Sequence, residues 1–259
     1  MKAILGCLAL GTVCVGMLLS DLVQRLVIGP WLWLRPAGRE RVLGRWLDFL
    51  AWLTTRPLEI IGGASLPRPP RVVPCEPGVL IVLNHQSLLD IPLGSKVLQS
   101  GYYSLVTRRR YARFIPLISH LTRLFRNPVV DPVANPGDSR RMLKALRSAA
   151  RDSRVPLMIY PEGTRTKDGE IGPFRRTGLE LILRARPFRV YAFVVDGLWQ
   201  YRTFHDLIGK MNGIDARMEY VGCFEWTDPK ADPGPFATEL RDRMVETLAG
   251  MRDHQSVGA

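Results

Sequence analysis

The amino-terminal part of the chain is dominated by apolar residues. Residues 3–19 are apolar except for one threonine and several glycines, and residues 26–34 form a second apolar patch with two tryptophans. The first run, of seventeen residues, is at the short limit for a helix that spans a bilayer. Tryptophans followed by arginines are typical of a membrane–water interface, and arginines favour its cytoplasmic side. The pattern predicts a membrane-anchoring helical segment over residues 1–56, which either crosses the membrane once or enters and leaves it as a helical hairpin.

A secretory signal peptide also begins with an apolar run, but only Lys2 precedes this one and no clear small-x-small cleavage site follows it. Further on, residues 42–53 carry apolar side chains at helical spacing. They predict a helix that either packs on the globular part or lies on lipid. The Gly- and Pro-rich residues 62–78 mark a link to the globular domain, which is predicted to occupy residues 57–259.

Beyond this link, short apolar runs alternate with amphipathic segments. Runs rich in β-branched and aromatic residues predict strands at residues 79–83, 102–107, 155–160, 189–195 and 217–224, and residues 59–73 are compatible with an additional edge strand. Helical spacing predicts helices at residues 115–125, 138–150 and 236–251, and the chain is expected to fray from residue 252 onward. Strands that alternate with helices indicate an α/β domain.

The strand at residues 79–83 ends in a cluster of polar side chains. Asn84, His85 and Ser87 follow it, and Asp90 stands five residues after the histidine. Open α/β sheets usually place ligands at the carboxyl ends of their strands. A histidine and an aspartate in this place can form a base and its orienter. Five residues on one continuous helix would turn the two side chains apart, so His85 must lie in the turn and Asp90 in the first turn of the next helix.

Two other interpretations of this stretch stay open. Ser87 and Asp90 have the spacing of a capping box, in which the carboxylate binds backbone amides at the start of a helix. His85 alone is equally compatible with a half-buried histidine whose hydrogen bonds are satisfied inside the domain. A histidine and an aspartate at this spacing also occur by chance, so this motif alone does not decide the function.

A second cluster of polar residues follows the strand at residues 155–160. Glu162, Gly163, Thr164 and Arg165 come directly after a Tyr-Pro pair. Glycine lets the backbone approach a ligand closely, threonine supplies a hydroxyl, and arginine can hold two phosphate oxygens at once. A surface turn with a Glu–Arg ion pair is the alternative. Because this is the second strand end that carries polar groups, the pattern favours a phosphate-binding site.

The chain is strongly basic, with a formal net charge of +12 at pH 7. A basic surface suits nucleic acid, anionic lipid headgroups or an acidic carrier protein. Residues 108–114 place four arginines among two aromatic residues. No nucleic-acid recognition motif surrounds them, and a membrane segment adjoins the domain, so anionic lipid is the expected partner. A solvated charged face is the alternative.

The cysteines indicate neither a metal site nor a disulfide framework. Cys7, Cys14, Cys75 and Cys223 show no CxxC pair and no metal-ligand spacing, and two of them lie in the apolar amino-terminal run. Free thiols that face lipid or the core are expected, and they are compatible with a reducing cytoplasm.

Taken together, residues 84–90 (NHQSLLD) and residues 160–165 (YPEGTR) resemble the two ordered motifs of the glycerolipid acyltransferase family, in particular the bacterial 1-acylglycerol-3-phosphate acyltransferases. The resemblance covers residues 76–195, and the apolar amino-terminal helices fit it as well. It implies a mixed, mainly parallel sheet flanked by helices. It also implies a catalytic His-x4-Asp motif and a Glu-Gly-Thr-Arg motif that binds the phosphate of the acceptor.

The resemblance further implies roles for individual residues. His85 would be the general base that takes a proton from the lipid hydroxyl, and Asp90 would orient it. The hydroxyl oxygen would attack the thioester carbonyl of the acyl donor directly, without an acyl-enzyme, a metal ion or a redox cofactor. The residues expected to bind substrate are Asn84, Ser87, Glu162, Gly163, Thr164 and Arg165, with Arg165 as the main phosphate contact.

The implied function is transfer of a fatty acyl group from acyl-CoA or acyl carrier protein to 1-acylglycerol 3-phosphate, which makes phosphatidate. The enzyme would sit in the cell inner membrane with its catalytic domain on the cytoplasmic side. Its partners would be membrane lipid, the lysolipid acceptor and the acyl donor, and not nucleic acid. The alternatives are the same chemistry on another acceptor (a lyso-ornithine lipid or a lysophospholipid), a thioesterase, and a non-catalytic lipid-binding protein.

Two positions depart from the family pattern. After the basic stretch the family usually has a hydrophobic residue, Asp and Arg, whereas residues 130–132 read VDP, so this arginine is missing. Arg123 and Arg126 are candidates to replace it. Ala192 stands where the family's fourth motif has a proline. The first departure bears on the identity of the acceptor, and the second bears on packing.

Overall fold

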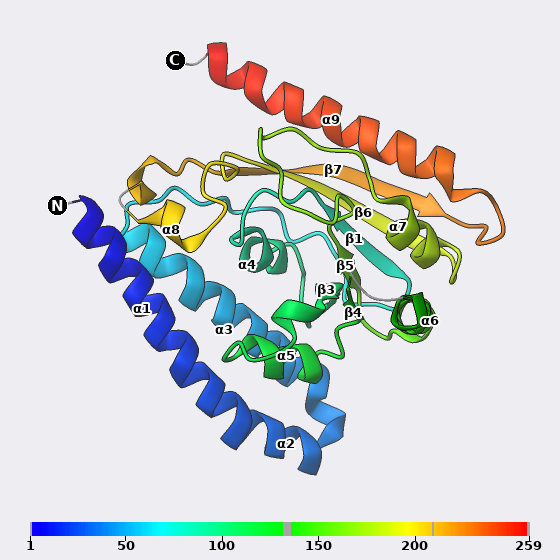
Figure 1. The fold of residues 1–259 in the computed structure, drawn as a ribbon, viewed down its shortest axis with the longest axis horizontal. Helices are drawn as coiled ribbons and strands as arrows, with labels where there is room; N and C mark the ends of the chain where they lie inside the picture. Colours follow the sequence, from blue (N-terminus) through cyan, green and yellow to red (C-terminus); the bar gives the residue numbers. More distant parts are fainter. Residues whose placement is uncertain (1, 132–135, 209, 258–259) are drawn as a thin grey trace.

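The computed structural model describes residues 2–131, 136–208 and 210–257, and a central sheet lies between helical layers (Figure 1). The strands of the main sheet are β1 Val79–Leu83, β2 Ser104–Leu105, β5 Leu157–Ile159, β6 Phe188–Asp196 and β7 Arg217–Trp226. A separate pair is formed by β3 Thr107–Arg108 and β4 Val129–Val130. Within the described residues the main sheet has five strands, in the order β2-β5-β1-β6-β7.

The sheet is mainly parallel, with one antiparallel strand. β1 pairs in parallel with β5 and with β6, and β2 pairs in parallel with β5, whereas β7 runs antiparallel to β6. The predicted mixed, mainly parallel sheet is therefore confirmed. Val82 lies opposite Ile159 across the β1–β5 pair. The polar residues that follow these two neighbouring strands therefore emerge at the same edge of the sheet.

Helices cover both faces of the sheet. The helices associated with one face are α1 Lys2–Val23, α2 Gly29–Leu34, α3 Arg39–Ile60, α4 Asp90–Ser95, α5 Ile118–Leu124 and α8 Phe204–Leu207. The other face carries α6 Pro136–Asp152, α7 Arg176–Leu183 and α9 Pro233–Val257. In Figure 1, α9 crosses above the sheet while α1 and α3 lie below it.

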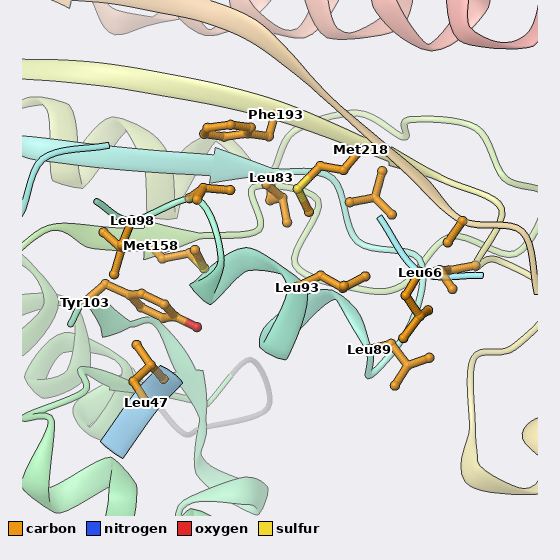
Figure 2. Close-up of a cluster of buried hydrophobic side chains, with 14 of the residues drawn as sticks. Leu47, Leu66, Leu83, Leu89, Leu93, Leu98, Tyr103, Met158, Phe193 and Met218 are labelled. Carbon is orange, nitrogen blue, oxygen red and sulfur yellow. The ribbon is translucent and has the colours of Figure 1, made fainter. Parts of the chain in front are cut away.

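The central strand β1 contributes side chains to both cores. Its sequence, VLIVL, is buried along its whole length. Ile81 and Leu83 belong to the core that faces α3 and α4, whereas Leu80 and Val82 belong to the core beneath α6, α7 and α9. Figure 2 shows Leu83 with Leu93 of α4 in the first of these cores. A continuous apolar run of this kind is what a strand buried on both faces requires.

The amino-terminal apolar stretches form one unbroken helix that folds back onto α3. α1, a π-helical turn at Gln24–Ile28 and α2 together span Lys2–Leu34. Among the described residues this is the helix that is long and apolar enough to cross a membrane. It packs beside α3, and we call the two the amino-terminal hairpin (Figure 1). The predicted domain boundary between residues 56 and 57 falls inside α3, which ends at Ile60, so the division of the chain stays a prediction.

Several elements differ in extent from their predicted bounds. The predicted strand at 102–107 is divided between β2 and β3. α5 begins only at Ile118, because Phe114 and Leu117 adopt positive φ values of 61° and 65°, which a helix does not allow. Residues 59–73 form no strand and only single bridges, at Ser65 and Val73.

The expectation that the chain frays from residue 252 is wrong. α9 continues to Val257, and Arg252 forms ion pairs with Glu170 and Asp196. These ion pairs hold the last turns of α9 in place, and their distance in sequence explains why the helical pattern did not predict them. Of the two departures from the family pattern, Ala192 is fully buried beside a register shift in the β6–β7 pair, where β7 has one extra residue, and Pro132 lies outside the described residues.

Candidate active site

The acid–base turn, residues 84–90, brings His85 and Asp90 into contact. His85 lies in the loop after β1, and Asp90 is the first residue of α4. Nδ1 of His85 lies 2.8 Å from Oδ2 of Asp90, a normal length for a charge-assisted hydrogen bond. A carboxylate only accepts, so Nδ1 carries the hydrogen and Nε2 keeps its lone pair. The His85 side chain is 18% exposed, so Nε2 can accept a proton from a bound molecule.

The same carboxylate oxygen also binds the backbone of the turn. Oδ2 of Asp90 accepts from the N–H of Gln86 at 2.6 Å and from the N–H of Ser87 at 2.8 Å. The capping interpretation and the acid–base interpretation therefore describe one arrangement, because the backbone bonds that close the turn also hold the carboxylate beside His85. The Asp90 side chain is fully buried, and its three donors fix its position.

Glu162 supports the acid–base turn from the neighbouring strand end. Its Oε1 accepts from the N–H of His85 at 2.9 Å, and its Oε2 accepts from the N–H of Gly172 at 3.3 Å. Burial raises the pKa of Glu162 to about 7, although these two hydrogen bonds act to lower it. Both carboxyl oxygens face the protein backbone, so the geometry points to a positioning role for Glu162 rather than the headgroup contact expected from the sequence.

Asn84 and Ser87 are likewise engaged with the backbone. The Asn84 amide forms two hydrogen bonds with Val195 of β6, donating at 2.8 Å and accepting at 2.7 Å. The Ser87 hydroxyl donates to the carbonyl oxygen of Tyr201. Both side chains are buried, which points to positioning roles in place of the substrate contacts expected from the sequence.

The EGTR turn, residues 160–165, presents backbone and arginine side chains at the same edge of the sheet. Gly163 has a φ of +65°, and a Cβ added there would lie 2.7 Å from Cδ of Arg175, so a side chain would strain the backbone and displace Arg175. Nη2 of Arg108 donates to the carbonyl oxygen of Gly163. Thr164 is exposed, and Arg165 is partly exposed with one guanidinium nitrogen on the carbonyl oxygen of Arg202.

Four arginines gather around this turn, and we call them the arginine rim: Arg108, Arg110, Arg165 and Arg175. Burial lowers the pKa of Arg108, and the positive charges of the other three lower it further. A group of like charges at a strand end attracts an anion. Of the two candidates for the missing family arginine, Arg123 lies elsewhere, because it lines a different cavity with Arg25.

The loop after the EGTR turn, residues 166–172, connects the site to α9, and we call it the clasp loop. The N–H of Thr166 donates to the carbonyl oxygen of His85 at 2.8 Å. Arg241 and Arg252 of α9 each donate to a carbonyl oxygen of the clasp loop at 2.9 Å. The two arginines are eleven residues apart, about three helical turns, so they share one face of α9.

Sequence reasoning missed the supporting residues of the site. Tyr160 stacks its ring on that of His85, with centroids 4.3 Å apart and an angle of 22° between the planes. Arg108 was assigned to a lipid-binding stretch, and Arg241 and Arg252 were given no role. The signal in the sequence is the spacing of Arg241 and Arg252, which places two arginines on one face of the carboxyl-terminal helix.

Comparison with known proteins confirms the family resemblance. The profile of the acyltransferase family matches residues 63–195, slightly more than half of the chain. The chain is 26% identical over 168 residues to a 1-acyl-sn-glycerol-3-phosphate acyltransferase of Cocos nucifera, a match that covers 62% of this chain and 48% of that protein. It is 22% identical over 193 residues to an enzyme of the same name from Saccharomyces cerevisiae, covering 74% and 59%. The chain thus spans about half the length of these relatives.

A solved structure shows the same fold over nearly the whole chain. The crystal structure of the 1-acyl-sn-glycerophosphate (LPA) acyltransferase PlsC from Thermotoga maritima superimposes with a TM-score of 0.71. The match covers 97% of this chain and 98% of that one, at 14% identity. The shared fold includes the long apolar amino-terminal helix.

Proposed function

We propose that this chain, which belongs to the acyltransferase family, transfers a fatty acyl group from acyl-CoA or acyl carrier protein to 1-acylglycerol 3-phosphate, and so makes phosphatidate. The observation that carries the proposal is the 2.8 Å contact between His85 and Asp90, joined through Glu162 to a turn surrounded by arginines. The names of the relatives support this acceptor.

The reaction needs a base, an acceptor hydroxyl and an activated acyl group. Nε2 of His85 takes the proton of the lipid hydroxyl as its oxygen attacks the thioester carbonyl carbon. The tetrahedral intermediate then breaks its carbon–sulfur bond, and the departing thiolate takes the proton from the imidazolium. Asp90, bonded at Nδ1, holds the ring in the tautomer that this step requires and stabilises the positive charge that forms.

The arginine rim is suited to the phosphate of the acceptor. Guanidinium groups bind phosphate oxygens in pairs, and charge-assisted bonds of this kind are about twice as strong as neutral ones. We assign the phosphate to Arg165 and Arg108, with the exposed Thr164 hydroxyl and the close backbone approach at Gly163 as further contacts. Glu162 acts on this step indirectly, through the backbone of His85.

The amino-terminal hairpin supports a membrane location. Large apolar side chains along α1 and α2 are exposed, among them Leu18, Leu19, Leu26 and Trp33. Exposed apolar area on this scale marks a lipid-facing surface. We therefore assign the chain to the cell inner membrane with the catalytic domain on the cytoplasmic side, which the arginines after the apolar segment favour.

A different acceptor is the second candidate, and one observation favours it. Residues 130–132 lack the arginine that the family pattern has after the basic stretch. A site with one fewer of the usual arginines suits an acceptor without a phosphate monoester, such as a lyso-ornithine lipid or another lysophospholipid, on which the chemistry at His85 would be unchanged.

Acyl transfer in detergent micelles tests the proposal. We would offer a labelled acyl donor and a panel of lysolipids to the wild type and to His85→Ala. A general base contributes about 10²- to 10⁴-fold, so the variant should be nearly silent. Product from 1-acylglycerol 3-phosphate, lost in the variant, is the expected result. Product from another lysolipid alone would show that the acceptor is a different lipid. No product from any lysolipid, with a well-folded protein, would favour a non-catalytic lipid-binding protein.

Arg165→Ala separates transfer from hydrolysis. If the acceptor phosphate binds at the arginine rim, the variant should lose transfer to 1-acylglycerol 3-phosphate. Release of free thiol without any lysolipid present, unchanged in Arg165→Ala, would instead identify a thioesterase that uses water as its acceptor.

A further inference from the structure

A second basic site lies where α5 meets the amino-terminal hairpin. A cavity of about 540 Å³ is lined by Arg25, Ala112, Arg113, Phe114, Ser119 and Arg123. Three of these six residues are arginines, against one adjacent carboxylate, Asp21, which pairs with Arg25 at 2.9 Å. The cavity therefore has an excess of positive charge and room for a phosphate-sized anion.

A buried polar network holds the two walls of this cavity together. Gln24, in the π-helical turn of the hairpin, is fully buried. Its amide donates to the carbonyl oxygen of Leu117 at 3.1 Å and accepts from the Trp46 indole at 3.0 Å. Asp21 accepts from the N–H of Leu117 at 2.9 Å. Hydrogen bonds in a buried setting are costly to break, so the hairpin and the loop before α5 keep their relative positions.

Exposed apolar side chains accompany the basic residues of this cavity. Phe114 is 96% exposed and has a φ of +61°. A bulky side chain held outward by a backbone conformation that costs free energy is frequently a functional feature. Leu22 and Leu26, on either side of Arg25 in the hairpin, are exposed as well. Cationic groups beside exposed hydrocarbon match a membrane surface, where phosphates lie next to acyl chains.

We propose that this cavity, the hairpin pocket, binds the phosphate of an anionic phospholipid of the bilayer, with Phe114 placed among its acyl chains. An acidic carrier protein would also offer negative charge, but its single acyl chain has to reach the reaction site at His85 and is not free to contact Phe114 and the neighbouring leucines. The inference rests on the membrane location proposed above and not on acyl transfer. Because residues 108–114 connect Arg108 to Phe114, a lipid in the hairpin pocket would also restrain the segment that carries Arg108.

Binding to lipid vesicles tests this proposal without any acyl donor. The purified full chain would be diluted from detergent into vesicles of phosphatidylcholine alone, or of phosphatidylcholine with about 30% phosphatidylglycerol, which gives the vesicles a negative surface potential. R113Q/R123Q is compared with R147Q/R217Q, which removes the same charge from exposed positions on α6 and β7. We expect R113Q/R123Q to weaken binding to anionic vesicles about tenfold or more, with little change on phosphatidylcholine.

Three outcomes would overturn the proposal. The first is equal weakening by R113Q/R123Q and R147Q/R217Q, which would mean that net charge alone is responsible. The second is no weakening by either variant. The third is normal vesicle binding by R113Q/R123Q together with lost activity on acyl carrier protein but not on acyl-CoA, which would assign the pocket to the carrier. His85→Ala should bind vesicles like the wild type, so a failure of the proposed reaction is distinguishable from a failure of lipid binding.

A separate observation concerns Tyr160. Its hydroxyl is buried and has no hydrogen-bond partner among the described residues, while its ring stacks on His85 at 4.3 Å. Burial raises the pKa of Tyr160 well above its usual value, so the phenol stays neutral. The hydroxyl of a buried tyrosine usually forms a hydrogen bond. Because the hydroxyl of Tyr160 forms none here, its ring, stacked on His85, is the part of the side chain with an evident role.

We infer that Tyr160 is a positioning residue for His85, whose ring holds the imidazole plane against Asp90 and favours the imidazolium that forms during the reaction. The face of an aromatic ring attracts a cation. The inference rests on the proposed function, because it concerns the same base.

Two variants separate the ring from the hydroxyl. Tyr160→Phe keeps the stacked ring and should retain kcat within about threefold, whereas Tyr160→Leu should lower kcat about tenfold. Without the ring the imidazolium is less stable, so the acid limb of the pH–rate profile should move to lower pH in Tyr160→Leu, by about half a unit. An unmoved acid limb, or a Tyr160→Phe variant as impaired as Tyr160→Leu, would overturn the inference. His85→Ala with full activity would instead remove the proposed function itself.

Discussion

The acid–base turn and the arginine rim occupy the same edge of the sheet but are held in opposite ways. In the acid–base turn one oxygen of Asp90 binds three donors of the protein, and Glu162 of the EGTR turn accepts from the N–H groups of His85 and Gly172. In the arginine rim, charges of one sign lie close enough to lower the pKa of Arg108, and the bonds that we observe go to neutral carbonyl and hydroxyl groups.

This difference separates the two tasks of the site. Groups that are already fixed by hydrogen bonds need no reorganisation at the moment of reaction, which is the condition for effective electrostatic catalysis. An anion that binds between like positive charges reduces the repulsion among them, so the rim favours binding of a negatively charged substrate. Changes in the acid–base turn should therefore alter kcat, and changes in the rim should alter KM for a phosphorylated acceptor.

The largest effect is expected from Asp90→Asn. The amide removes the negative charge that stabilises the imidazolium, and it places a donor group where three donors meet one oxygen. We expect kcat to fall about 10²- to 10⁴-fold, with little change in KM for the acceptor. The comparison variant is Asp152→Asn, on the exposed face of α6. Activity within a few-fold of the wild type in Asp90→Asn would show that His85 works without its orienter.

Arg108→Gln should affect binding and not the chemical step. A charge-assisted hydrogen bond to phosphate contributes about 1.5–3 kcal/mol, so KM for 1-acylglycerol 3-phosphate should rise about 10- to 100-fold at nearly constant kcat. Arg154→Gln, at an exposed position before β5, controls for the loss of charge. If kcat fell and KM did not change, Arg108 would belong with the acid–base turn, as a support of Gly163, and the separation between the two regions would fail.

The sequence predicted the acid–base turn better than the rim, and the reason is the range of the contacts. His85 and Asp90 are five residues apart, so a turn and a helix start are enough to join them. In the rim, Arg108 reaches Gly163 across fifty-five residues, and Arg165 reaches Arg202 across thirty-seven. Contacts of this separation depend on strand order and helix packing, which hydrophobic periodicity does not specify.

The fold follows the same rule. β1 and β6 were predicted nearly to the residue, because a run of buried β-branched residues leaves few alternatives. The break before α5 was missed, because Leu117, which has a positive φ, bonds through its backbone to Asp21 and Gln24 of the amino-terminal hairpin, far away in sequence. The end of α9 was missed because Arg252 is held by residues far away in sequence.

Glu162→Gln tests whether the connection between the two regions sets the geometry of His85. A glutamine has one acceptor oxygen for the two amides of His85 and Gly172, so one buried N–H is left without its partner. We expect kcat to fall about tenfold. Glu219→Gln, on the exposed side of β7, is the matched control and should leave kcat unchanged.

The same variant carries a prediction on pH and stability. The pKa of Glu162 is raised to about 7 in the folded protein from an ordinary value of 4.5. Between these values the unfolded chain has released the proton and the folded chain keeps it, so folding stability is lost as the pH rises through this window. Glu162→Gln cannot ionise, so its melting temperature relative to wild type should increase from pH 5 to pH 7.5. Thermal unfolding of both proteins in micelles, at several pH values in this range, measures the difference. A constant difference would mean that the folded-state pKa is not raised.

The smallest effect is expected from Arg252→Gln, which acts on the acid–base turn through two intermediates. Arg252 holds Asp196 and the clasp loop, and the clasp loop in turn bonds the carbonyl oxygen of His85. Because the guanidinium is about one-third exposed, we expect a loss of only about 1–2 kcal/mol. The melting temperature should fall by about 3–6 °C, with kcat lowered less than threefold. Arg243→Gln, whose ion pair is exposed and 3.8 Å long, should change neither. If Arg252→Gln reduced kcat as much as Glu162→Gln, α9 would belong to the acid–base machinery. The base would then depend on contacts far away in sequence as much as on the short-range contact between His85 and Asp90.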